Sequence, residues 1–105
     1  MAQFQESQRP DGTSVLGVEG EVDVAVVDEL IGRMRDSLDR GQALELDCSG
    51  LTFIDSSGLG GLVLVSKEAA AQGKAFGLVN VHSTALRLLQ VSGLYDTLVK
   101  QDPQT

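Results

Sequence analysis

The sequence predicts an α/β fold: a mixed, mostly parallel sheet of four to five strands, with an antiparallel first strand and helices mainly on one face. Strand-like and helix-like segments alternate after residue 12, which is typical of parallel strands joined by right-handed crossovers. Arg9-Pro10-Asp11-Gly12 is a turn signal between two short strand-like segments, so an antiparallel hairpin opens the chain. Residues 43–49 alternate strictly between apolar and polar side chains, which predicts a strand with one buried and one wet face.

The 105 residues suit one compact domain over residues 1–105, because 42% of them are hydrophobic and 22% are charged. Residues 1–12 are predicted to form an edge strand and a turn, and residues 101–105 a loose tail. The first helix is predicted between Asp23, as its N-cap, and Gly41, as its end. Apolar side chains recur there at helical spacing: Val27, Leu30, Ile31, Met34 and Leu38.

Four more segments complete the predicted fold. Residues 59–65 are apolar enough for a buried strand or a helix, but the alanine, lysine and glutamate residues after them favour a helix that ends at Gly73. A strand follows at residues 74–81, then a helix capped by Ser83, then an edge strand at residues 96–100. Because Glu45 and Asp47 share one strand face, we expect the helices mainly on the other face.

Charge and composition exclude several classes of partner. The formal net charge of −7 repels nucleic-acid phosphates and anionic lipids, so we expect no direct nucleic-acid or membrane partner and favour a partner with a basic patch. The longest apolar run, residues 59–65, is too short to cross a bilayer. Cys48 is the single cysteine, so it forms no intramolecular disulfide and is predicted in the core. With no secretory signal at the N-terminus, these features favour the cytoplasm.

The segment Asp55-Ser56-Ser57-Gly58 lies where a strand region passes into the second predicted helix. Asp55, Ser56 or Ser57 could cap this helix, since these residue types accept hydrogen bonds from its first N–H groups. Alternatively, one hydroxyl is a phosphoacceptor, because a helix N-terminus can hold a phosphate without melting the fold. The residue types alone leave both interpretations open.

Nothing in the sequence predicts an enzyme, a metal site or a cofactor. His82 is the single histidine and is predicted as a solvated turn residue, so a hydroxyl nucleophile would lack the usual base. Cys48 and His82 do not have the spacing of metal ligands. Neither a P-loop nor the Gly-x-Ser-x-Gly elbow of hydrolases occurs.

Three motifs resemble the anti-sigma factor antagonists, which are small bacterial STAS domains. They are GEVDV at residues 20–24, LDCSGLTFIDSSGLGGL at residues 46–62 and VSGLYDTL at residues 91–98, and the middle one is the most specific. The resemblance, over residues 13–100, implies a STAS-like fold and a partner-switching function. In that family the unmodified antagonist binds an anti-sigma factor, which frees a sigma factor. The anti-sigma factor is also a serine kinase. It phosphorylates the antagonist with ATP and magnesium, which ends the binding, and a phosphatase then removes the phosphate.

Residue by residue, the resemblance implies that Ser56 is the phosphoacceptor, with Ser57 as the second choice. The candidate partner-binding residues are Asp23, Asp55, Ser57, Gly58, Leu59 and Gly60. The glycines at positions 58, 60 and 61 would let a kinase pocket approach the backbone, or they mark close packing of the helix.

Two other functions stay open. STAS domains also serve as accessory subunits of transporters and lipid-transport complexes, in which the serine is only a cap. The helix N-terminus could instead hold a nucleotide phosphate. Many relatives carry a further helix after the last strand, which is missing or very short in a chain that stops at Thr105. We therefore expect a less covered sheet edge and weak self-association.

Overall fold

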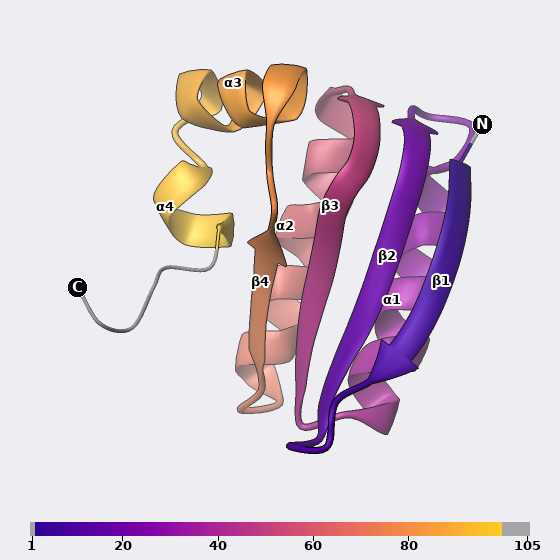
Figure 1. Cartoon of the computed structure of the whole chain (residues 1–105). Helices are drawn as coiled ribbons and strands as arrows, with labels where there is room; N and C mark the ends of the chain where they lie inside the picture. Colours follow the sequence, from indigo (N-terminus) through magenta and orange to yellow (C-terminus); the bar gives the residue numbers. More distant parts are fainter. Residues whose placement is uncertain (1, 100–105) are drawn as a thin grey trace.

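The computed structural model describes residues 2–99 and confirms the predicted α/β class (Figure 1). Within that range the strands are β1 (Ala2–Gln8), β2 (Thr13–Val22), β3 (Ala43–Ile54) and β4 (Ala75–Val79). They lie in the order β1-β2-β3-β4, and only β1 runs antiparallel to its neighbour. The helices are α1 (Val27–Arg40), α2 (Ser56–Ala71), α3 (Ser83–Ser92) and α4 (Tyr95–Leu98).

Helices α1 and α2 cover one face of the sheet, as predicted, and among residues 2–99 no helix lies on the opposite face (Figure 1). Helix α3 lies at the carboxyl ends of the parallel strands, and α4 lies beside β4. This arrangement places the start of α2 and the loop between β2 and α1 at the same end of the sheet.

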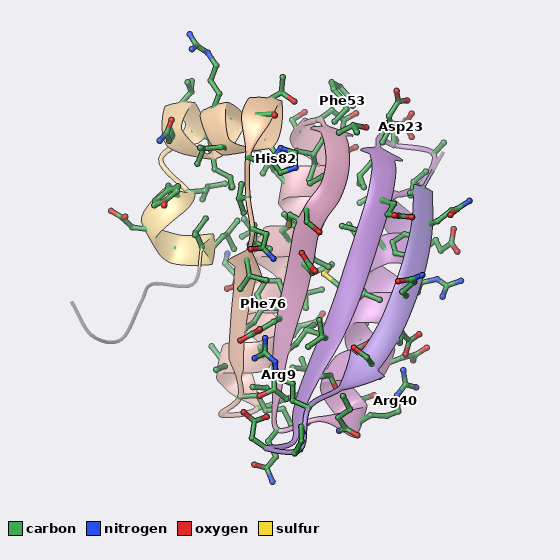
Figure 2. The ribbon with its side chains drawn as sticks, viewed as in Figure 1. Arg9, Asp23, Arg40, Phe53, Phe76 and His82 are labelled. Atoms are coloured by element: carbon green, nitrogen blue, oxygen red, sulfur yellow. The ribbon has the colours of Figure 1, made fainter. Side chains whose placement is uncertain are left out.

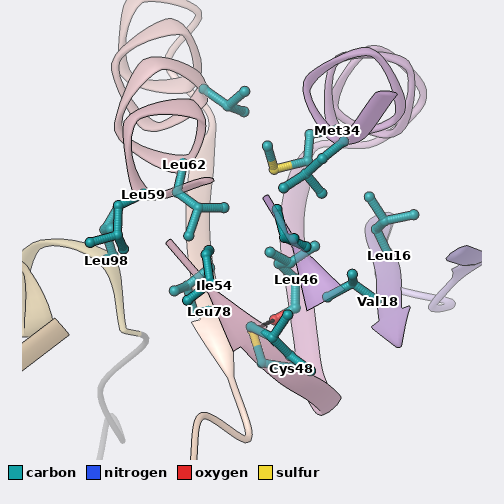
Figure 3. Packing of buried hydrophobic residues seen from close by; sticks show 14 of the residues in the cluster. Leu16, Val18, Met34, Leu46, Cys48, Ile54, Leu59, Leu62, Leu78 and Leu98 are labelled. Carbon is teal, nitrogen blue, oxygen red and sulfur yellow. Dashed lines mark hydrogen bonds between the residues drawn. The ribbon is translucent and has the colours of Figure 1, made fainter. Parts of the chain in front are cut away.

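The core lies between the sheet and helices α1 and α2 (Figure 3). Leu16, Leu46 and Leu78 contribute from three neighbouring strands, while Met34 and Leu62 contribute from α1 and α2. Cys48 belongs to the same cluster, as its alternation with Leu44 and Leu46 predicts. Burial and the neighbouring charge of Asp47 raise the pKa of the Cys48 thiol to about 12, so the thiol stays neutral.

The predicted last strand at residues 96–100 is wrong for the residues that the structure describes. Residues 95–98 form α4, in which Leu98 is buried, and Val99 then makes an isolated parallel bridge to Leu78. The cause is Gly93, whose left-handed backbone (φ 78°) turns the chain so that the Leu94 N–H donates to the Leu89 carbonyl. The predicted tail at residues 101–105 lies outside the described residues.

Two predicted helix caps also need correction. Helix α1 begins at Val27, and Val26 caps it without a side-chain bond, because Asp23 holds the preceding turn through its own carbonyl. Helix α3 has His82 at its N-cap, and Ser83 is already inside the helix with φ 57°.

Glu45 does not face open water as its strand pattern predicts. Its side chain points to the helix-free face but is only 4% exposed, because Arg9 from the first turn covers it. Arg9 Nη2 lies 2.5 Å from Glu45 Oε1. Strand periodicity does not predict that a distant arginine side chain will cover a residue on the open face of the sheet.

Candidate functional site

Strand β3 delivers the Asp55-Ser56-Ser57-Gly58 segment to the end of the sheet, where α2 begins at once. Asp55 is the N-cap: its backbone is extended, and its Oδ1 accepts the N–H of Gly58 at 3.1 Å. The same oxygen accepts the Ser57 hydroxyl at 2.6 Å. The Ser57 hydroxyl foremost, and then the Gly58 N–H, lower the pKa of Asp55 below its ordinary value of 3.8. Of the three candidate caps, Asp55 fills the role.

The two serines differ in what their hydroxyls can do. Ser57 is half-buried and donates its hydrogen bond to Asp55. Ser56 is exposed as the first residue of α2, and its hydroxyl has no hydrogen-bond partner among residues 2–99. An enzyme that reaches this segment from solvent therefore finds the Ser56 hydroxyl accessible and uncommitted.

The loop between β2 and α1 lies next to this segment (Figure 2). The Asp55 N–H donates to the carbonyl of Val22 at 3.2 Å, which joins the end of β2 to the cap of α2. Asp23 follows directly, partly exposed, and its Oδ1 accepts the Ala25 N–H at 3.0 Å. Asp23 therefore shapes this loop and also presents carboxylate surface beside the serine segment.

Two exposed apolar side chains near this segment were missed by the sequence reasoning. Val24 is 74% exposed in the β2–α1 loop, and Phe53 is 44% exposed at the end of β3 (Figure 2). Phe53 pairs with Glu21 and precedes buried Ile54, so it points to the helix-free face. The sequence does contain a signal for Phe53, because a residue next to a core residue of the same strand, such as Ile54, points to the opposite face of the sheet. It was missed because β3 was predicted to end at Ser49.

The glycine-rich start of α2 divides into buried and open positions. Gly58 is buried, and a Cβ there would meet Ile54 at 2.5 Å. Leu59 is 6% exposed and belongs to the core. Gly61 allows α2 to approach α1, since its Cβ would lie 3.0 Å from Val27. Gly60 is exposed, with nothing within 4 Å of such a Cβ. Of these four, only Gly60 offers direct surface to a partner.

The charge around the segment is negative. Four carboxylates lie on the elements that meet here, and none of them pairs with a cation inside the described part of the chain: Glu21, Asp23, Asp28 and Asp55. Across residues 2–99, no three His, Cys, Asp or Glu side chains gather as metal ligands would. His82 is exposed, but both its ring nitrogens make contacts, one with the Ser49 carbonyl and one with the Ser83 hydroxyl. No helix in the described range is long and apolar enough to cross a membrane.

Comparison with known proteins gives three relevant similarities. The anti-sigma-B factor antagonist of Bacillus subtilis (strain 168) is 28% identical over 83 residues, which cover 79% of this chain and 76% of that protein. The crystal structure of an anti-sigma factor antagonist from Mycobacterium paratuberculosis superposes with a TM-score of 0.83 at 25% identity, covering 99% of this chain and 89% of that one. A sulfate transporter family protein from Wolinella succinogenes has the same fold, with a TM-score of 0.72 at 19% identity over 88% of this chain and 75% of that one.

The sequence model of one family, described as "Mlab, STAS domain", matches residues 6–100. This match covers every described element except the first residues of β1, and the strand order and helix placement agree with the fold of the similar structures. The chain therefore belongs to the STAS domain family and has the fold of its anti-sigma factor antagonists.

Proposed function

We propose that this protein is an anti-sigma factor antagonist that a serine kinase switches off by phosphorylating Ser56. Unmodified, it binds an anti-sigma factor, which is also that kinase, and a sigma factor is freed. The single observation that supports this most is the exposed Ser56 hydroxyl, uncommitted among residues 2–99, at the N-terminus of a 16-residue helix. The similarity to the Bacillus subtilis antagonist adds support.

The position of Ser56 lets a phosphate change binding without unfolding the domain. A phosphoserine carries nearly two negative charges and three acceptor oxygens. The N-terminus of α2 favours negative charge, because its first N–H groups and the helix dipole point toward it. Asp55 and Asp23 already make the surface negative, so a partner pressed against it would have to desolvate the added charge beside carboxylates. That cost falls on the complex and not on the free protein.

In the proposed transfer, Ser56 Oγ forms a bond to the γ-phosphorus of ATP. The bond from that phosphorus to the bridging oxygen of the β-phosphate breaks, and ADP leaves. The hydroxyl proton passes to a base of the kinase, which also holds the magnesium ion. This chain is then the substrate and not the catalyst, and a phosphatase later hydrolyses the phosphate ester. With these partners, the proposed site of action is the cytoplasm, without a direct role for nucleic acid.

The test is a kinase assay with the cognate anti-sigma factor, ATP and magnesium, read by mass spectrometry with phosphosite mapping. The wild-type chain and Ser57→Ala should each gain one phosphate, on Ser56. Ser56→Ala should gain none and still bind the anti-sigma factor. Ser56→Asp should bind about tenfold or more weakly, because it places one permanent charge at the site. Phosphate on Ser57 alone, or full binding by Ser56→Asp, would contradict the proposal.

A second candidate function is that of the accessory subunit of a transporter or lipid-transport complex, and the fold shared with a sulfate transporter family protein favours it. In that case Ser56 only begins a helix. Stable co-purification with a transport ATPase subunit, unchanged by Ser56→Ala or Ser56→Asp, would favour it. Genes for a sigma factor and a kinase next to this gene would favour the antagonist instead.

A further inference from the structure

Among residues 2–99, the half of β3 that leads to the serine segment has a neighbouring strand on one side only. Strand β4 pairs with β3 only from Ala43 to Asp47. Beyond Asp47, residues 48–54 pair with β2 alone. On the β4 side, the chain leaves the sheet as the loop of residues 80–82 and enters α3 (Figure 1). This outer half of β3 leads directly to Asp55 and Ser56.

The pairing of this half with β2 is also irregular. Gly17 pairs with Asp47, and the next pair is Glu19 with Gly50. The step is two residues along β2 but three along β3, so β3 has one extra residue at positions 48–49. A second extra residue, Thr52, lies between the pairs Gly20–Leu51 and Glu21–Phe53. Such bulges disrupt the ladder of backbone hydrogen bonds.

Side chains of the β4–α3 segment occupy the place of the missing strand. His82 Nε2 lies 2.9 Å from the carbonyl oxygen of Ser49, and Thr84 Oγ1 donates to the carbonyl of Thr52 at 3.2 Å. Both carbonyls belong to residues at the bulges. Because a carbonyl only accepts, His82 Nε2 carries the proton in this contact. Asn80 Nδ2 donates to Asp47 Oδ1 at 3.0 Å, just where β4 stops pairing.

The backbone of this segment is held in an uncommon conformation. Asn80 and Ser83 have φ angles of 58° and 57°, in the left-handed region that side chains other than glycine rarely adopt. The Ser83 hydroxyl lies 2.9 Å from His82 Nδ1 and so fixes the ring orientation. Left-handed residues persist where the surrounding contacts determine them, and here those contacts direct three side chains at β3.

We propose that Asn80, His82 and Thr84 form a side-chain latch that holds the outer half of β3 and so positions Ser56. These three are positioning residues, because none of them touches Ser56. The functional consequence of the latch rests on the proposed function. That consequence is that a rigid serine segment binds the partner and kinase better than a mobile one. The structural part of the latch stands on the contacts alone.

The test measures amide hydrogen exchange, residue by residue, in the full chain. Thr84→Val removes the hydroxyl at constant shape, and His82→Ala removes the ring. Each should speed exchange of the amides of residues 50–58 by about tenfold, as expected for the loss of one local hydrogen bond. The amides of residues 44–46, which have strands on both sides, should not change. Thr84→Ser should restore protection, and Thr97→Val on α4 is the matched control.

Three outcomes would overturn the latch: no change in residues 50–58, an equal change in residues 44–46, or no rescue by Thr84→Ser. A parallel titration with the cognate anti-sigma factor tests the consequence. Thr84→Val should bind several-fold more weakly and Thr84→Ser normally. If the wild-type chain does not bind the anti-sigma factor at all, the proposed function fails, while the exchange result still decides the latch.

Discussion

The two ends of the sheet differ in how their charged side chains are paired (Figure 2). At the basal end, formed by the second half of α1 and the starts of β2 and β3, cations meet acceptors: Arg9 binds Glu45, Arg40 binds Glu6, and Lys74 Nζ donates to the Leu38 carbonyl at 2.7 Å. At the serine end, formed by the β2–α1 loop, the end of β3 and the first turn of α2, the carboxylates named above have no cation within residues 2–99. Apolar Val24 and Phe53 lie exposed beside them.

This difference teaches where stability and binding reside. Compensated charge and buried leucines stabilise the fold at the basal end. Uncompensated negative charge beside exposed apolar side chains contributes little to folding, but it suits a partner with a basic rim and an apolar pocket. Substitutions should therefore act on folding at one end and on association at the other.

The largest effect should come from the basal end. Leu38→Ala removes a side chain that is 1% exposed between α1 and the sheet. We expect the free energy of unfolding to fall by about 3 kcal/mol, because both burial and packing are lost. Urea unfolding followed by circular dichroism measures it. A loss below about 1 kcal/mol would contradict the assignment of stability to this end.

At the serine end, Phe53→Ala should reverse that pattern. We expect the free energy of unfolding to change by less than about 1 kcal/mol, because nearly half of the ring is already in water. Affinity for the cognate anti-sigma factor should fall by about tenfold or more, as for an aromatic anchor at an interface. Calorimetric titration measures it. Val91→Ala, on α3 and 77% exposed, is the matched control and should bind normally.

The cap of α2 should contribute a smaller, pH-dependent stability. The pKa of Asp55, the N-cap residue, is lower in the folded state than its ordinary value of 3.8, so the unfolded state binds the proton more readily. The contribution of Asp55 is therefore complete above that ordinary value and is lost as the pH falls through the lower, folded-state value. Asp55→Ala should lower the melting temperature by about 5 °C at pH 7 and much less at pH 2. An equal loss at both pH values would contradict this role.

The smallest effect should come from an exposed ion pair on the first half of α1. Arg33→Met removes the pair with Glu29, at 3.1 Å, and the position over the Phe4 ring, at 4.9 Å from its centre, but keeps an apolar stem. We expect a loss of about 0.5 kcal/mol that shrinks as salt is added. Urea unfolding at low and high salt measures it. A salt-independent loss would show that packing of the arginine, rather than its charge, stabilises α1.

Much of this could be predicted from the sequence because it depends on local patterns. The spacing of Leu30, Met34 and Leu38 gave α1, the alternation around Leu46 gave β3, and Asp55-Ser56-Ser57 pointed to the start of α2. Several contacts that the sequence did not predict have a different origin. The cover of Glu45 by Arg9, the bridge from Val99 to Leu78 and the contact of His82 with Ser49 join residues far apart in the sequence. No local pattern carries such contacts, and tertiary packing alone decides them.

The most direct test compares the phosphorylated and unmodified chains in their affinity for the cognate anti-sigma factor, with the melting temperature of each measured in parallel. We predict that one phosphate, mapped to Ser56, weakens binding by about a hundredfold or more and leaves the melting temperature nearly unchanged. Equal affinity of the two forms, or loss of binding caused by unfolding, would contradict the account.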